Sequence, residues 1–106
     1  MAVITGQDDY YTLVNVFKVA PEHQTRVYDA IVGATDVIRA LPGFVSANVH
    51  LTKDGVHVVN YAQWRSKADF DAMLVSPGVQ DHFKVCRELA EMDTILCRTT
   101  ALVEAA

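Results

Sequence analysis

A stretch near the middle of the chain, residues 54–64, has the composition of a β-strand entered from a tight turn. The turn signal is Lys53-Asp54-Gly55, and most of the residues after it are β-branched or aromatic. Because side chains alternate between the two faces of a strand, Asn60 and Trp64 lie on one face, about 13 Å apart. A carboxamide and an indole N–H are unusual core residues. The pattern therefore indicates the lining of an aromatic pocket that carries a few polar groups.

The segments before this strand predict a strand, a helix and a second strand. The first strand covers residues 10–19, and the helix begins at Pro21 and ends at Pro42-Gly43. Apolar residues recur along the helix at a spacing of three or four, which predicts one buried stripe: Val27, Ala30, Ile31, Ala34, Ile38 and Leu41. The second strand covers residues 44–52 and forms a hairpin with the strand that ends at Trp64.

The segments after Trp64 predict an interrupted helix and a last strand. Ser66 and Asp69 resemble a capping box, and a short helix follows them. Ser76-Pro77-Gly78 interrupts this helix and starts a longer piece, whose apolar stripe contains Val79, Phe83, Cys86, Leu89 and Ala90. The last strand is expected over residues 93–103.

The predicted order is βαββαβ, which indicates an α+β, ferredoxin-like fold. One antiparallel four-stranded sheet would carry both helices on one face. The 106 residues suffice for one domain, so residues 1–106 are expected to form it, with residues 1–9 as a flexible N-terminus.

The strand faces suggest which side of the sheet is covered by helices. We expect the apolar face of the second strand, Val45, Ala47, Val49 and Leu51, to meet the helices. The face with Asn60 and Trp64, and the face with Ser46, Asn48 and His50, would then point outward. A second copy of the chain or a ligand would cover this outward surface, so the sequence predicts a homodimer.

Composition and charge exclude several classes of protein. A formal net charge of −4 with scattered basic residues argues against nucleic-acid binding and against an anionic membrane surface. No apolar run is long enough to span a membrane, and the first nine residues do not resemble a secretory signal, so a cytoplasmic protein is expected. Cys86 and Cys97 have neither metal nor redox spacing, which indicates two reduced thiols. There is no His/Cys cluster and no Rossmann glycine motif, so we expect neither a metal nor a cofactor.

Several strings resemble the antibiotic biosynthesis monooxygenase family. They are Pro42-Gly43-Phe44-Val45-Ser46-Ala47, then His50, then Asp54-Gly55, then Val58-Val59-Asn60-Tyr61-Ala62-Gln63-Trp64, and the similarity runs from about Tyr11 to Val103. The most specific part is the last five residues, Asn60 to Trp64. The resemblance implies a dimeric α/β barrel in which two ferredoxin-like domains pack sheet to sheet. It also implies that O2 oxidises an aromatic polyketide of the anthrone type without flavin, haem or metal.

The resemblance also implies roles for particular residues. It places the pocket Asn and Trp of the family on Asn60 and Trp64, which we take as catalytic candidates. A family tyrosine proposed to transfer a proton corresponds to Phe70, and a family arginine falls near Lys84. The change at Phe70 removes a tyrosine-mediated proton relay and leaves another donor, or loss of the activity, as the alternatives.

Further residues are candidates for the same pocket. His50 could act as a base for a phenolic proton, because its unperturbed pKa of about 6.5 suits neutral pH, or it could be a partly exposed strand histidine. Asn15, Phe17, Phe44, Ser46, Asn48, Phe70 and Lys84 are the substrate-binding candidates.

Three alternatives to a cofactor-independent oxygenase stay open at this point. The same pocket could serve a polyketide cyclase or isomerase, which transfers protons only. The domain could also bind a small molecule or act in stress without turnover. Haem degradation is disfavoured: Asn15 and Trp64 match two parts of that site, but no histidine follows between Phe70 and Leu74.

Overall fold

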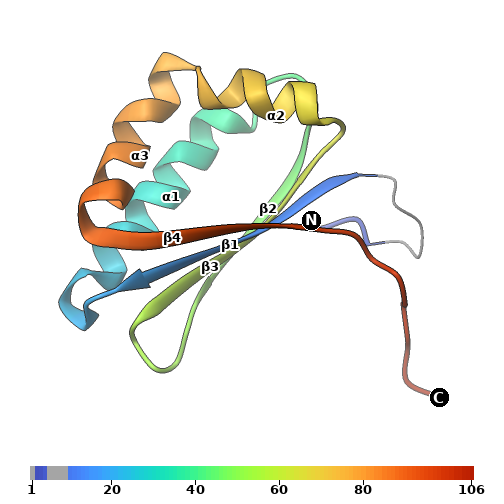
Figure 1. The fold of residues 1–106 in the computed structure, drawn as a ribbon, viewed down its shortest axis with the longest axis horizontal. Coiled ribbons are helices and arrows are strands. Elements are labelled where there is room, and N and C mark those ends of the chain that lie inside the picture. The colour runs from blue at the N-terminus through green and yellow to red at the C-terminus, as the bar shows by residue number, and fades with distance from the viewer. Residues whose placement is uncertain (1, 5–9) are drawn as a thin grey trace.

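The computed structural model describes residues 2–4 and 10–106, and its regular elements follow the predicted order. The strands are β1 (Tyr11–Val19), β2 (Phe44–Leu51), β3 (His57–Trp64) and β4 (Ala90–Cys97). A 3₁₀ turn, η1 (Pro21–His23), precedes helix α1 (Gln24–Ile38), and two helices, α2 (Lys67–Leu74) and α3 (Pro77–Leu89), separate β3 from β4. The antiparallel sheet has the order β2-β3-β1-β4, and the helices lie together on one side of it (Figure 1). The α+β, ferredoxin-like prediction is therefore confirmed.

The predicted apolar stripe of α1 forms the centre of the core. Its buried residues are Val27, Ala30, Ile31, Ala34 and Ile38, and they pack against the sheet and against α3. The capping signal before α2 is also present: the backbone N–H of Asp69 donates to Ser66 Oγ at 3.2 Å, and this hydroxyl donates to Asp69 Oδ2 at 2.9 Å. Among the residues that the structure describes, no helix is long and apolar enough to cross a membrane.

The last strand differs from the prediction in position. We expected residues 93–103, whereas β4 runs from Ala90 to Cys97 and follows α3 without any intervening residue. The pairing with β1 explains its limits, because Ala90 lies opposite Val19 and Cys97 lies opposite Thr12, close to the start of β1. Residues 98–106 therefore have no partner strand and no regular structure.

The register of the sheet corrects the expected orientation of the Asn60 face. Val49 lies opposite Asn60 and Ala47 opposite Ala62, so Asn60 and Trp64 share the face that the helices cover. A bulge between Phe44 and Ser46 also turns Phe44 toward Trp64. The prediction that Asn60 and Trp64 point outward is therefore wrong.

The outer face of the sheet points away from the helices and carries the remaining side chains of the strands. Ser46, Asn48 and His50 pair with Gln63, Tyr61 and Val59 on this face. Apolar side chains occupy its centre: Val14, Val16, Val59, Tyr61 and Ile95.

Part of the N-terminal segment is tied to the sheet by Gln63, a fully buried residue of the outer face. The Val3 N–H donates to Gln63 Oε1 at 2.8 Å, and Gln63 Nε2 donates to the Val3 carbonyl at 2.5 Å. Ser46 Oγ donates to the same Gln63 oxygen at 2.8 Å. The expected flexibility of residues 1–9 thus does not extend to Val3, while residues 1 and 5–9 lie outside the described residues.

Candidate active site

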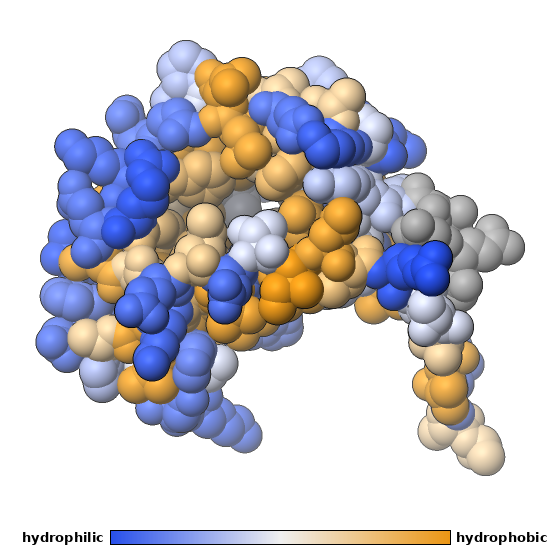
Figure 2. Space-filling model, viewed as in Figure 1, coloured by the Kyte–Doolittle hydropathy of each residue, from blue (hydrophilic) through white to orange (hydrophobic). Residues whose placement is uncertain are grey.

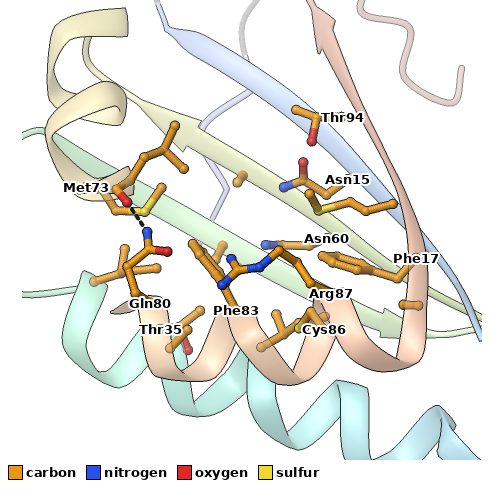
Figure 3. Close-up of a pocket in the computed structure, with 18 of the residues that line it drawn as sticks. Asn15, Phe17, Thr35, Asn60, Met73, Gln80, Phe83, Cys86, Arg87 and Thr94 are labelled. Carbon is orange, nitrogen blue, oxygen red and sulfur yellow. Dashed lines mark hydrogen bonds between the residues drawn. The ribbon is translucent and has the colours of Figure 1, made fainter. Parts of the chain in front are cut away.

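A cavity of about 360 Å³ lies between the helix-covered face of the sheet and helices α1 and α3. All four strands and all three α-helices contribute residues to its wall. Figure 2 shows the corresponding hollow between the helices and β4, and Figure 3 shows the side chains that surround it. The volume falls within the range of about 300–1,000 Å³ that is typical of small-molecule sites.

Three polar side chains form a row across the floor of this cavity. Asn60 on β3 pairs with Asn15 on β1, and Asn15 pairs with Thr94 on β4, so the three share the helix-covered face. Asn60 is 9% exposed, and its Oδ1 has no hydrogen-bond partner among the described residues. A buried acceptor without a partner costs about 1–3 kcal/mol, which a bound donor would recover. The row therefore offers hydrogen-bonding groups to a polar part of a ligand within an otherwise largely apolar cavity.

An aromatic cluster closes one end of the cavity. Trp64 is only 1% exposed, and its ring lies 5.4 Å from Phe44 and 6.3 Å from Phe70, both in edge-to-face contact. Phe70 also contacts Tyr11 at 5.5 Å. Trp64 and Phe44 line the cavity, whereas Phe70 does not line it and packs against Trp64. Edge-to-face packing of this kind fixes the orientation of the indole.

Arg87 supplies the positive charge of the cavity, and the sequence did not single it out. Its guanidinium reaches into the ring of side chains shown in Figure 3. No described carboxylate lies within 4.0 Å of it. Lys84, the residue that the resemblance indicated, is exposed one helical turn earlier and does not line the cavity. The signal that could have found Arg87 is its place beside Phe83 and Cys86 on the apolar stripe of α3.

The structure divides the predicted site residues into two groups. Asn60, Trp64, Asn15, Phe17 and Phe44 line the same cavity. The other five do not line it: His50, Ser46, Asn48, Phe70 and Lys84.

Three members of the second group lie on the outer face of the sheet. His50 is exposed and lies opposite Val59, so within one chain it cannot act as a base for a ligand beside Asn60. Ser46 binds Gln63, and Asn48 Nδ2 donates to the Tyr61 carbonyl at 3.3 Å. Their hydrogen bonds give both residues a structural role.

Apart from Arg87, the side chains that line the cavity are uncharged. Among the described residues, those that line the cavity include no histidine, aspartate or glutamate. Burial raises the pKa of the Cys86 thiol to about 11, although the charge of Arg87 opposes this shift. Cys86 is therefore protonated at neutral pH. No group of three or more His, Cys, Asp or Glu side chains is placed to hold a metal ion within the described part of the chain.

Comparison with known proteins agrees with this architecture. The family model "Antibiotic biosynthesis monooxygenase" matches residues 10–88. The chain is 54% identical over 101 residues to tetracenomycin-F1 monooxygenase of Streptomyces glaucescens, covering 94% of this chain and 90% of that protein.

Two solved structures are similar along almost their whole length. One is an Asn-to-Ala variant of SnoaB, a cofactor-independent oxygenase from Streptomyces nogalater, with a TM-score of 0.74, 25% identity, and coverage of 92% of this chain and 99% of that one. The other is the ActVA-Orf6 monooxygenase of Streptomyces coelicolor in complex with nanaomycin D, with a TM-score of 0.71, 27% identity, and coverage of 92% and 95%. With the family model matching most of its length and a relative more than half identical, the chain belongs to the antibiotic biosynthesis monooxygenase family.

Proposed function

We propose that this protein is a cofactor-independent monooxygenase that oxidises an aromatic polyketide of the anthrone type with O2 to a quinone. The observation that carries the proposal is the unpartnered Asn60 Oδ1 in a cavity otherwise lined largely by apolar and aromatic groups. Its relatives support it: one is named a tetracenomycin-F1 monooxygenase, another a cofactor-independent oxygenase, and a third holds nanaomycin D.

The chemistry requires little from the protein beyond binding, charge stabilisation and a dry cavity. An anthrone loses a proton from the carbon between its rings, and the resulting anion transfers an electron to O2. A C–O bond then forms and gives a hydroperoxide at that carbon. Cleavage of the O–O bond with loss of the remaining C–H proton leaves a carbonyl and water. One oxygen atom of O2 enters the quinone and the other leaves as water.

The polar groups of the cavity would act on the anion. The Asn60 side-chain amide both donates and accepts, so Nδ2 would hold the substrate oxyanion while Oδ1 accepts a substrate hydroxyl. Asn15 would bind the same edge of the ring system, and the positive charge of Arg87 would favour the deprotonated substrate. Trp64 and Phe44 would contact the rings and exclude water.

We also propose that two chains associate through the outer faces of their sheets, in the cytoplasm. The apolar centre of that face, Val14, Val16, Val59, Tyr61 and Ile95, would be covered by the same face of a second copy. The surface left for a second copy is this outer face, because the helices cover the face with Asn60 and Trp64. Cys86 and Cys97 are free, which suits a reducing compartment.

The test compares turnover of an anthrone in air and under argon. An oxygenase forms the quinone only in air, and ¹⁸O2 should deliver one labelled oxygen atom to each product molecule. Conversion of a polyketide substrate under argon would instead indicate a cyclase or isomerase. A labelled oxygen that comes from H2¹⁸O rather than from O2 would contradict the oxygenase proposal.

A further inference from the structure

A second, shallower cleft of about 510 Å³ adjoins the aromatic end of the cavity. Three of the nine basic residues of the chain line it: Arg65, Lys67 and Arg98. Tyr11 and Leu96 form part of its wall, and none of the described residues that line it is acidic. In a chain with a formal net charge of −4, this gathering of positive charge is local.

Within the part of the chain that the structure describes, neither arginine of this cationic cleft has a carboxylate partner. Lys67 Nζ binds Asp71 Oδ2 at 2.6 Å, which satisfies that lysine. No carboxylate of the described residues lies within 4.0 Å of Arg65 or Arg98. Both arginines line the same cleft, so an anion bound there would be attracted by two positive charges.

One face of β4 contributes residues both to the cavity and to the cationic cleft. Met92, Thr94 and Leu96 lie on the helix-covered side of this edge strand, yet Met92 is 55% and Leu96 60% exposed. Met92 and Thr94 line the cavity, whereas Leu96 lines the cleft. Arg98 follows Thr94 by four positions, about 13 Å along an extended chain. Four linearly fused six-membered rings are of comparable length.

We infer that a polycyclic substrate lies lengthwise along this face of β4, with a carboxylate on its terminal ring bound by Arg65 and Arg98. This inference rests on the proposed function, because it places the reacting ring beside Asn60 and the opposite end of the molecule in the cationic cleft. The rings would cover the exposed side chains of Met92 and Leu96. The planar donors of arginine match a carboxylate in two parallel hydrogen bonds.

Binding of product-like quinones tests this assignment without turnover. The two probes are a tetracene-5,12-quinone that carries a carboxylate on its terminal ring and the methyl ester of the same compound. Trp64 is the only tryptophan of the chain and lines the cavity, so quenching of its fluorescence reports occupancy. The wild-type protein should bind the carboxylate about three- to tenfold more tightly than the ester, the effect expected of two partly exposed ion pairs.

The double variant Arg65→Gln/Arg98→Gln removes the charges but keeps polar side chains of similar length. It should lose the preference for the carboxylate and bind the ester as the wild type does. Lys84→Gln is the matched control, since it removes an exposed cation outside both the cavity and the cleft, and it should leave both affinities unchanged.

Two results would overturn the inference while leaving the proposed function intact. One is equal affinity of the wild type for the two probes. The other is a preference for the carboxylate that survives in the double variant but disappears in Arg87→Gln, which would assign the anion to the cavity. Failure of both probes to bind would instead contradict the aromatic cavity on which the proposed function stands.

Discussion

The side chain of Asn60 combines burial with an unpartnered oxygen, and this allows its role in folding to be separated from its role in catalysis. Asn60→Ala removes an unsatisfied acceptor, so the melting temperature should stay close to that of the wild type or rise. Loss of the donor to the oxyanion should lower turnover by about 10- to 1,000-fold. Initial rates of quinone formation, read by absorbance, together with thermal melting, measure both effects.

Asn48 provides the matched control for this prediction. It carries the same carboxamide, but on the outer face of the sheet, where it binds the Tyr61 carbonyl. Asn48→Ala should leave turnover nearly unchanged. If Asn60→Ala melts normally and turns over substrate as fast as the wild type, Asn60 has no catalytic role.

Trp64 contributes to stability as well as to the pocket. The indole is almost fully buried between Phe44 and Phe70, so Trp64→Phe leaves unfilled space and should cost about 1–3 kcal/mol of unfolding free energy. Because a ring still faces the substrate, the substrate affinity should change less than the turnover number. Urea denaturation and the separation of kcat from KM check this. If Trp64→Phe unfolds with the same free energy as the wild type, the indole does not contribute to stability by packing between Phe44 and Phe70.

The sequence identified some pocket residues correctly and missed others for definable reasons. Asn60 and Trp64 lie on one strand, and their alternation alone places them on one face. Arg87 was missed because arginine on a helix usually faces solvent, and here the residue is exposed although it also lines the cavity. The alternation of β2 correctly predicts that Ala47 and Val49 meet the helices and that His50 points outward. It does not show that Asn60, on the neighbouring strand, lies on the opposite face from His50.

Two glycines with similar backbone angles predict different costs of substitution. Gly43 and Gly55 have φ values of +81° and +80°, so alanine is strained by about 1–2 kcal/mol at either position. At Gly55 an added Cβ meets nothing within 4 Å, whereas at Gly43 it would lie 2.2 Å from Asp69 Cγ. Gly43→Ala should therefore displace Asp69, weaken the cap of α2, and cost about 1 kcal/mol more than Gly55→Ala. Equal losses in chemical denaturation would contradict this.

The order of the elements was predictable, whereas the pairing of the strands was not. Periodicity identified α1 and its buried stripe, and a capping signal identified the start of α2. The loop between β2 and β3 contains five residues, Thr52 to Val56, and several registers are compatible with that length. Only the observed register, with Val49 opposite Asn60, decides which face receives the helices. A shift of one residue in this register exchanges the two faces of β3, so the alternation of Asn60 and Trp64 alone could not show that they face the helices.

Association of two chains can be tested at the centre of the outer face. Val59 pairs with Val16 there, and both are half-buried in one chain. Val59→Lys should place a charge in the proposed interface and convert the dimer to a monomer in sedimentation equilibrium at micromolar concentration. Lys53→Glu, in the hairpin turn, changes charge away from this centre and should leave the dimer intact. A wild-type protein that sediments as a monomer would contradict the proposed association.

The direct junction of α3 and β4 has a consequence for motion. Leu89 ends the helix, Ala90 begins the strand, and the Ala90 N–H donates to the Cys86 carbonyl, so this corner of the cavity is closed by the covalent chain itself. By contrast, α2 has eight residues, only Met73 of which is buried, and it forms another part of the wall. Amide hydrogen exchange should therefore be faster in α2 than in the middle of α3. Motion of the cavity wall is therefore expected in α2 and not at the junction of α3 and β4.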